Sequence, residues 1–269
     1  MGSPVNHSLS PYIHNTLADK LSDDLIYVVF DVKSDKLGMA VKGAYAMGVA
    51  GLNITFPHKT DVAEYVVSLD ELSIHSAAIN TLSYSKDGYI GYNTDIIGVE
   101  KSFAHHGVEI AGRTAVVYAA GGAGRSAAIA LARMKCKKII IVNRTKNKAE
   151  FLAELLKKHY TVDVEICEPK DFCDVKAHVL IQALSLGIGD ISDFFSLPNS
   201  QIVRNYDVVF DMNYFPLENK LIKDAKTQGI YAFNGIEMLV YQAAAAYEIF
   251  HNKIISQDII DELIYSIRR

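Results

Sequence analysis

Short apolar runs alternate with amphipathic stretches along the whole chain. An apolar run of five to seven residues is typical of a strand, and a stretch with apolar residues every three or four positions is typical of a helix. We expect strands at residues 25–30, 51–56, 114–118, 138–144, 162–167, 178–184, 206–212 and 230–234. We expect helices at residues 35–48, 96–107, 121–134, 147–160, 217–229, 235–250 and 256–267, the last with Ser256 as its N-cap. This alternation predicts an α/β fold with largely parallel sheets.

Two features stand out in the first third of the chain. NTLSYS (80–85) and YIGYN (89–93) are separated by the turn residues KDG, which predicts a β-hairpin. In GLNITFPHK (51–59), Asn53 and Thr55 stand two apart, so they share one face of the expected strand, and Lys59 follows just after it. A strand facing water and a pocket for a polar ligand both explain this pattern.

Composition excludes several classes of protein. Half of the 269 residues are hydrophobic, which suits a globular protein with a sizeable core. The net charge of −4, without a Lys/Arg cluster, argues against a nucleic-acid partner. No apolar run approaches the roughly 18 residues of a membrane span, and the N-terminus does not resemble a secretion signal. Cys136, Cys167 and Cys173 have no CxxC spacing, so we interpret them as thiols of a cytoplasmic protein and expect no metal site.

The stretch VVYAAGGAGRSAA predicts a turn from a strand directly into a helix. Glycine lets a backbone approach a pyrophosphate, and a helix N-terminus offers N–H groups to it. The first glycine of the usual GxGxxG pattern is replaced by Ala119, and a tight turn without a ligand would use similar residues. The expected cofactor-contacting residues of the turn are Ala119, Ala120, Gly121, Gly122, Ala123 and Gly124.

The end of the next predicted strand favours NADP over NAD. An NAD site carries an acid there for the ribose hydroxyls, whereas this chain has Asn143, Arg144 and Thr145, with Lys148 close behind. A guanidinium can pair with a 2′-phosphate through two hydrogen bonds, and an acid would repel it. The alternative is that Arg144 and Lys148 are solvated charges at a helix start.

Several segments resemble the shikimate dehydrogenase family. HSLSP (7–11), GLNITFPHK (51–59), INT with YNTD (79–81, 92–95) and GIEMLVYQAA (235–244) are similar to its signature stretches, and AAGGAGRS and NRTKNKA to its NADP site. The match runs in order from Gly2 to the C-terminal helix. The resemblance implies reversible reduction of 3-dehydroshikimate to shikimate with NADPH, in aromatic amino-acid biosynthesis. We expect a cytoplasmic monomer or homodimer. It also implies a substrate-binding domain of residues 1–96 and 236–269 and a Rossmann-like NADP-binding domain of residues 97–235.

The resemblance also implies roles for individual residues. Lys59 and Asp95 match the catalytic pair, with Lys59 moving a proton or stabilising negative charge on the substrate oxygen. The expected substrate-binding residues are Ser8, Ser10, Asn53, Thr55, Asn80, Tyr214 and Gln242, and Met212 and Gly235 match cofactor contacts. Structural explanations stay open: Ser10 as a helix N-cap before Pro11, Asp95 as the cap of the next helix, Asn80 in a turn, and Tyr214 and Gln242 as ordinary amphipathic residues.

Three features depart from the family pattern, and two alternative functions stay open. Only Met1 precedes Gly2, where the family begins with a strand, and QALSLG (182–187) stands where the family has NATSSG, so we expect a more apolar nicotinamide site. Ala119 stands where glycine is usual, which costs roughly 1 kcal/mol if its φ is positive and is tolerable if its φ is negative. The alternatives are a quinate/shikimate dehydrogenase with relaxed cofactor use and a non-catalytic NADP-binding homologue. The two serines speak against the first, and the retained Lys59 and Asp95 against the second.

Overall fold

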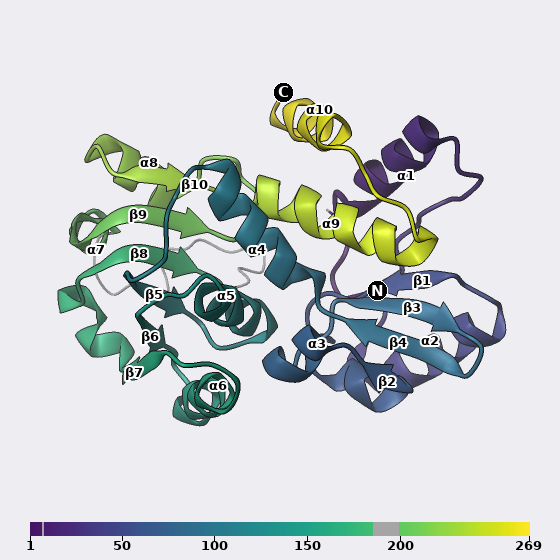
Figure 1. Cartoon of the computed structure of the whole chain (residues 1–269), viewed down its shortest axis with the longest axis horizontal. Helices are drawn as coiled ribbons and strands as arrows, with labels where there is room; N and C mark the ends of the chain where they lie inside the picture. Colours follow the sequence, from purple (N-terminus) through teal and green to yellow (C-terminus); the bar gives the residue numbers. More distant parts are fainter. Residues whose placement is uncertain (7, 185–198) are drawn as a thin grey trace. The chain divides into compact units, whose positions relative to one another are not determined.

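The computed structural model describes residues 1–6, 8–184 and 199–269 (Figure 1). The chain forms two compact units, one of Met1–Gly98 with Leu239–Arg269 and the other of Val99–Met238. Each unit contains its own sheet with helices, so the α/β class is confirmed.

The first unit contains a four-stranded sheet in the order β1-β3-β4-β2. Its strands are β1 (Gly51–Asn53), β2 (Ser68–Leu69), β3 (Thr81–Ser85) and β4 (Gly88–Tyr92). The predicted hairpin is confirmed: β3 and β4 are antiparallel, and Ser85 lies opposite Gly88 across a two-residue turn. β1 also pairs antiparallel with β3, whereas β2 pairs parallel with β4. The expectation of largely parallel sheets is therefore wrong here, because so short a turn can join only antiparallel strands.

The first unit also contains helices. They are α1 (Ser10–Leu21), α2 (Leu37–Ala46), α3 (Glu71–Ser76), the start of α4 (Thr94–His105), most of α9 (Ile236–His251) and α10 (Gln257–Arg268), with the 3-10 helices η1 (Ser34–Lys36) and η2 (Asp61–Tyr65). α2 buries Leu37, Val41 and Ala44 in one core with Leu52 of β1 and Leu82 of β3. The apolar positions of α2, three or four apart, therefore face the sheet as the pattern predicts.

The strand predicted at residues 25–30 is wrong. Among the described residues no strand pairs with this segment, and Ile26 is 80% exposed. One isolated bridge, Gly2 to Asp31, follows it, where Gly2 donates to the Phe30 carbonyl (3.4 Å) and accepts from the Val32 N–H (2.9 Å). An apolar run becomes a strand only when another segment lies alongside it to complete the hydrogen-bond ladder. β1 ends at Asn53 instead of continuing to residue 56, although Thr55 still donates to the Met1 carbonyl (2.9 Å) and the Phe56 carbonyl accepts from the N–H of Ser3 (3.0 Å).

The second unit contains a six-stranded parallel sheet in the order β10-β9-β8-β5-β6-β7. The strands are β5 (Thr114–Tyr118), β6 (Lys138–Val142), β7 (Asp163–Cys167), β8 (Ala177–Gln182), β9 (Tyr206–Asp211) and β10 (Tyr231–Phe233). The helices are the rest of α4, α5 (Gly122–Arg133), α6 (Lys146–His159), α7 (Asn199–Ile202), α8 (Lys220–Thr227) and the start of α9, with the 3-10 helices η3 (Pro169–Asp174) and η5 (Val203–Asn205). Strand order reverses between β5 and β8, and in open parallel sheets ligands bind beyond the carboxyl ends of the strands at such a point.

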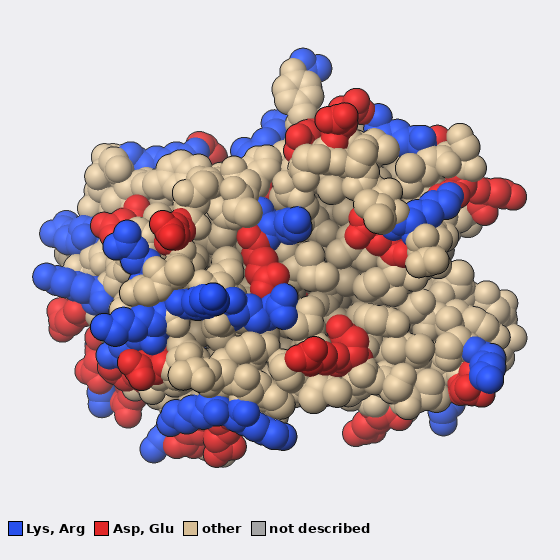
Figure 2. Space-filling view, viewed as in Figure 1, with Lys and Arg blue, Asp and Glu red and all other residues tan. Residues whose placement is uncertain are grey.

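The surface drawn in Figure 2 carries basic and acidic side chains interspersed with each other. In the part of the chain that the structure describes, no helix combines the length and apolarity that crossing a membrane requires.

Candidate functional site

Lys59 and Asp95 meet in the first unit. Lys59 lies in the turn after β1, where its carbonyl accepts a hydrogen bond from the N–H of Ile79 (2.8 Å), and Asp95 is the second residue of α4. The Lys59 Nζ lies 2.5 Å from Asp95 Oδ2, and the two side chains are 19% and 5% exposed. The ion pair is thus shielded from water on most sides but still open at the lysine. A proton-transfer role for the pair stays a prediction.

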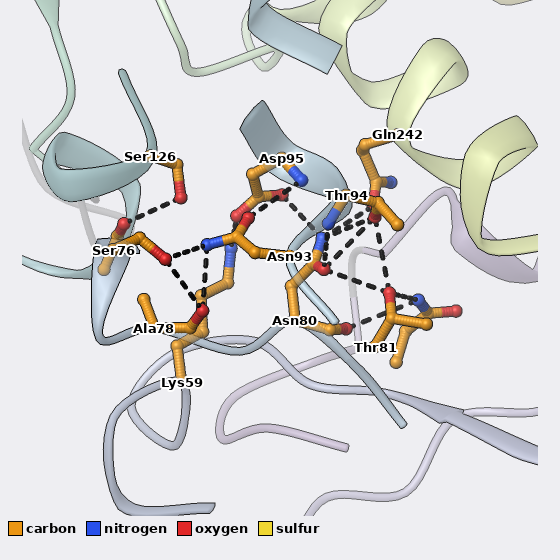
Figure 3. A network of polar contacts seen from close by, with 12 residues as sticks. Lys59, Ser76, Ala78, Asn80, Thr81, Asn93, Thr94, Asp95, Ser126 and Gln242 are labelled. Carbon is orange, nitrogen blue, oxygen red and sulfur yellow. Dashed lines mark hydrogen bonds and ion pairs between the residues drawn. The ribbon is translucent and has the colours of Figure 1, made fainter. Parts of the chain in front are cut away.

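Asn80 connects this ion pair to its surroundings (Figure 3). Its Nδ2 lies within hydrogen-bond distance of Asp95 Oδ1 (2.8 Å), Thr94 Oγ1 (2.9 Å) and Gln242 Oε1 (3.2 Å). Its Oδ1 accepts from the backbone N–H of Thr94 (2.8 Å). Asp95 therefore has one oxygen held by an amide and the other by the lysine, which fixes the plane of its carboxylate.

The start of α4 is capped by Asn93. Asn93 Oδ1 accepts from the N–H of Asp95 (3.1 Å), and its Nδ2 donates to Ser76 Oγ and the Ala78 carbonyl (both 2.9 Å). The interpretation of Asp95 as the helix cap is therefore wrong, because its side chain is directed to Lys59 and Asn80 instead.

A chain of hydrogen bonds continues from Asn80 to a residue that the sequence analysis missed, Tyr27. Thr81 Oγ1 donates to Asn80 Oδ1 (3.0 Å), Asn53 Nδ2 donates to Thr81 Oγ1 (3.0 Å), and the Tyr27 hydroxyl donates to Asn53 Oδ1 (3.0 Å). Burial raises the pKa of Tyr27, and a hydrogen bond with the Ser10 side chain partly offsets the rise. The polar network thus reaches from Lys59 to the first residue of α1.

Helix α1 determines where the Tyr27 hydroxyl lies. Asn15 binds the backbone of Tyr27 twice, accepting from its N–H (2.7 Å) and donating to its carbonyl (3.0 Å). The His14 ring stacks on the Tyr27 ring with 4.2 Å between centroids. No local signal could have singled out Tyr27, because one tyrosine in an apolar run is ordinary for a strand.

The remaining expected substrate residues are placed as follows. Ser8 Oγ accepts from the N–H of Ser10 (3.2 Å), and the N-cap of α1 is Leu9. The N-cap interpretation of Ser10 is therefore wrong, because Ser10 is already the first residue of the helix and the side-chain acceptor is Ser8, two residues earlier. Thr55 is exposed and its N–H donates to the Met1 carbonyl (2.9 Å), and Tyr214 belongs to the second unit, in the loop after β9.

The glycine turn lies at the carboxyl end of β5, beside the reversal of strand order. α5 begins at Gly122 without a side-chain cap, which leaves its first N–H groups for a ligand. A Cβ on Gly121 would meet nothing within 4 Å, whereas a Cβ on Gly124 would lie 2.0 Å from the carbonyl oxygen of Ala119. The turn thus combines open space with close backbone packing, which fits a diphosphate.

Ala119 has a φ of 102°, so of the two possibilities it adopts the costly positive one. The chain must leave β5, where the Ala119 N–H donates to the Val142 carbonyl (2.8 Å), and turn at once toward Gly124. A side chain at positive φ costs about 1–2 kcal/mol, which the packing around the turn must offset.

Two cations follow β6. Arg144 and Lys148 are exposed, and neither is paired with a carboxylate among the described residues. Lys146, in contrast, has its Nζ 3.7 Å from Glu150 Oε1. An unpaired guanidinium beside the glycine turn suits a phosphate better than it suits a ribose hydroxyl.

Backbone contacts connect the other expected cofactor positions. Asn143 Oδ1 accepts from the N–H of Ala120 (3.1 Å), and its Nδ2 donates to the Thr145 carbonyl (2.8 Å). A Cβ on Gly235 would lie 2.2 Å from the carbonyl oxygen of Met212, so only glycine fits there. Of QALSLG, residues 185–187 lie outside the described residues. The described residues include no cluster of three His, Cys, Asp or Glu side chains that could hold a metal ion.

Comparison with known proteins gives concordant matches along the chain. Three family profiles match: the shikimate dehydrogenase substrate binding domain at residues 1–82, shikimate / quinate 5-dehydrogenase at residues 101–185, and the shikimate 5′-dehydrogenase C-terminal domain at residues 235–264. A shikimate dehydrogenase (NADP(+)) of Caldanaerobacter subterraneus is 36% identical over 98% of this chain and 94% of its own.

Solved structures agree with these matches. The chorismate mutase/shikimate 5-dehydrogenase fusion protein of Clostridium acetobutylicum has a TM-score of 0.88 at 31% identity, covering 99% of this chain and 95% of that one. The 5-ketofructose reductase of a Gluconobacter strain has a TM-score of 0.82 at 28% identity, covering 99% and 96%. The fold is thus shared by enzymes named for different substrates.

Proposed function

The chain belongs to the shikimate dehydrogenase family, and from this premise we propose that it catalyses the reversible NADPH-dependent reduction of 3-dehydroshikimate to shikimate. The observation that carries the proposal is the shielded pair of Lys59 and Asp95, 2.5 Å apart and connected to amide and hydroxyl side chains. A small, polyhydroxylated, anionic substrate needs such short donors and acceptors. An apolar pocket would not select it.

The proposed chemistry begins with a protonated Lys59. Asp95 Oδ2 occupies one of its three N–H groups, which leaves two that can be directed at a substrate oxygen. NADPH, when bound, supplies a hydride to the ketone carbon. As the oxygen gains negative charge, Lys59 donates a proton to it and is left as a neutral amine beside Asp95. Asn80 keeps the carboxylate oriented throughout, since it holds the other oxygen.

The proposed substrate contacts divide into two groups. Asn53, Asn80 and Gln242 already belong to the hydrogen-bonded network around the ion pair. Four hydroxyl-bearing residues are assigned to the substrate because they match the family pattern. They are Ser8, Ser10 and Thr55 in the first unit and Tyr214 in the second.

The proposed cofactor is NADP. Residues 119–124 at the start of α5 would hold its diphosphate and Arg144 and Lys148 its 2′-phosphate, and Met212 and Gly235 would make further contacts with it. The division into a substrate domain and an NADP domain belongs to the same proposal. A cytoplasmic location, a monomeric or homodimeric state and the lack of a nucleic-acid partner remain predictions, the last supported by the net charge of −4.

Turnover of shikimate tests the proposal directly. The purified chain should reduce NADP⁺ with shikimate, and Lys59→Ala should lower kcat by about 10²-fold or more with little change in the KM for shikimate. Lys42→Ala, at an exposed lysine of α2, is the matched control and should behave as the unchanged protein. Near-normal turnover of the Lys59 variant would remove the lysine from the mechanism. Folded protein that binds NADPH but turns over no substrate would instead indicate the non-catalytic homologue.

A second substrate needs the same assay, because one matching family profile names quinate beside shikimate. Quinate carries an additional hydroxyl at the carbon that bears the carboxylate, and Ser8 and Ser10 leave less room for it than smaller residues would. We therefore expect a lower kcat/KM with quinate than with shikimate. Equal values would favour the quinate/shikimate enzyme.

A further inference from the structure

Asp211 is a fully buried acid that the proposed reaction does not use. It is the last residue of β9, with an exposed fraction of 0%. Its Oδ1 accepts from the backbone N–H (2.9 Å) and the side-chain Nδ2 (2.8 Å) of Asn213, and its Oδ2 accepts from Asn219 Nδ2 (2.5 Å). Burial raises the pKa of Asp211, and the hydrogen bonds from the two asparagines counter the rise. No ion pair among the described residues includes this carboxyl group.

The partners of Asp211 hold the ends of three adjacent strands together. Asn213 donates through Nδ2 to the Leu184 carbonyl after β8 (3.1 Å), and its own carbonyl accepts from the N–H of Gly235 after β10 (3.1 Å). Met212 donates to the carbonyl of Gln182, the last residue of β8 (2.9 Å). These are the carboxyl ends of the strands, the edge at which such sheets bind ligands.

Asn219 cannot adapt to a change at Asp211. Its Oδ1 accepts from the N–H of Ile222 and caps α8 (3.1 Å), so its Nδ2 must face Asp211. An amide at position 211 has one acceptor oxygen where the carboxylate has two, so an NH₂ group would face the NH₂ group of Asn219. Leaving buried donors unsatisfied is costly, and this explains why the site contains a carboxylate despite its desolvation.

We propose that Asp211 is a positioning residue for the cofactor. By accepting three hydrogen bonds from Asn213 and Asn219, it sets the backbone of Met212 and Gly235, two of the positions assigned to cofactor contacts. The inference rests on the proposed function. It concerns the shape of the loop after β9 and assigns Asp211 no contact with substrate or with the reacting atoms.

The test is NADPH binding, measured by fluorescence titration without substrate. Asp211→Asn should raise the Kd for NADPH by about tenfold, while kcat at saturating cofactor and the KM for shikimate change less than about threefold. In the double variant Asp211→Asn with Asn219→Asp, the two side chains exchange donor and acceptor, so the Kd should return to within about threefold of the unchanged protein. Asp207→Asn is the control, because Asp207 lies on the same strand with its side chain 76% exposed.

The outcomes separate this proposal from the proposed function. Failure of the unchanged protein to bind NADPH would overturn both the proposed function and the positioning role of Asp211. Normal binding by that protein and by Asp211→Asn removes only the positioning role, and so does a folded double variant that binds as weakly as the single one. If Asp211→Asn does not fold, the double variant decides alone, since its Kd supports the role when restored and overturns it when weak.

Discussion

Acidification should destabilise the chain through His14, a buried histidine of α1. His14 is 2% exposed and lies against the rings of Tyr27 (4.2 Å) and Tyr247 (6.1 Å between centroids). Burial lowers the pKa of His14 to about 3, and the nearby positive charge of His251 acts in the same direction. In the unfolded chain the same imidazole takes up a proton near its ordinary value of about 6.5.

The sign and size of the change in unfolding free energy follow from this difference in pKa. Between about pH 6.5 and about pH 3 the unfolded chain binds a proton at His14 that the folded chain does not. The stability present above about pH 6.5 is therefore lost as the pH falls. Each pH unit in that window costs about 1.4 kcal/mol, so at pH 5, about 1.5 units below the unfolded pKa, the loss is about 2 kcal/mol. That is a large fraction of the roughly 5–15 kcal/mol typical of a folded domain.

Other groups titrate over the same range, so a variant is needed to isolate His14. Burial also lowers the pKa of His251, which Asp23 partly offsets and Lys253 reinforces, and it lowers that of the Met1 amine to about 6. Both therefore add to the pH dependence of the unchanged protein.

The assay is urea unfolding at pH 7 and pH 5 of the unchanged protein and of His14→Phe, which keeps a ring against Tyr27 but has no proton to gain. The fall in unfolding free energy should be smaller in the variant by about 2 kcal/mol. His105→Phe, at an exposed position of α4, should leave the fall unchanged. Equal falls in the unchanged protein and His14→Phe would refute the reasoning.

Two further predictions concern binding. Arg144→Ala should raise the KM for NADPH by about 10- to 100-fold, which corresponds to the loss of a charge-assisted hydrogen bond, and should leave the KM for NADH unchanged. The control Lys146→Ala, whose lysine pairs with Glu150, should change neither KM. An equal effect of Arg144→Ala on both cofactors would contradict the assignment of Arg144 to the 2′-phosphate. Tyr27→Phe should raise the KM for shikimate by roughly tenfold, because Asn53 loses the hydroxyl that orients its amide. Tyr45→Phe, which removes a hydroxyl bonded to the Ser85 and Lys86 carbonyls, should lower stability without changing that KM, and a matching rise in both variants would remove the special role of Tyr27.

Local patterns were sufficient for most of the second unit. β5, β6 and β9 lie where apolar runs predict strands, because a parallel strand covered on both faces needs apolar residues at nearly every position. α5 and α6 likewise follow from their periodicity. The glycine turn was also visible, since Gly124 is required by a close contact only five residues away, at Ala119.

Non-local contacts decided the rest. Residues 25–30 have the composition of a strand, yet pairing depends on what lies beside a segment. In the described part of the chain, the one bridge next to this segment joins Gly2 to Asp31. The same limit applies to Ala119, whose positive φ is set by the geometry of the turn and not by its own preference. Tyr27 and Asp211 were missed because each acts through partners that no spacing along the chain reveals.

The amino-acid sequence by itself determined the α/β class, most helices and strands of both units, the family, and the identity of the residues proposed for proton transfer and for the cofactor phosphates. Only the tertiary structure decided that Lys59 Nζ and Asp95 Oδ2, from residues 36 positions apart, lie 2.5 Å from each other. It also decided which amides and hydroxyls orient these two side chains. The physical reason is that periodicity and turn residues are encoded within a few positions. The direction and partners of a buried polar side chain depend instead on segments that meet only after the chain has folded.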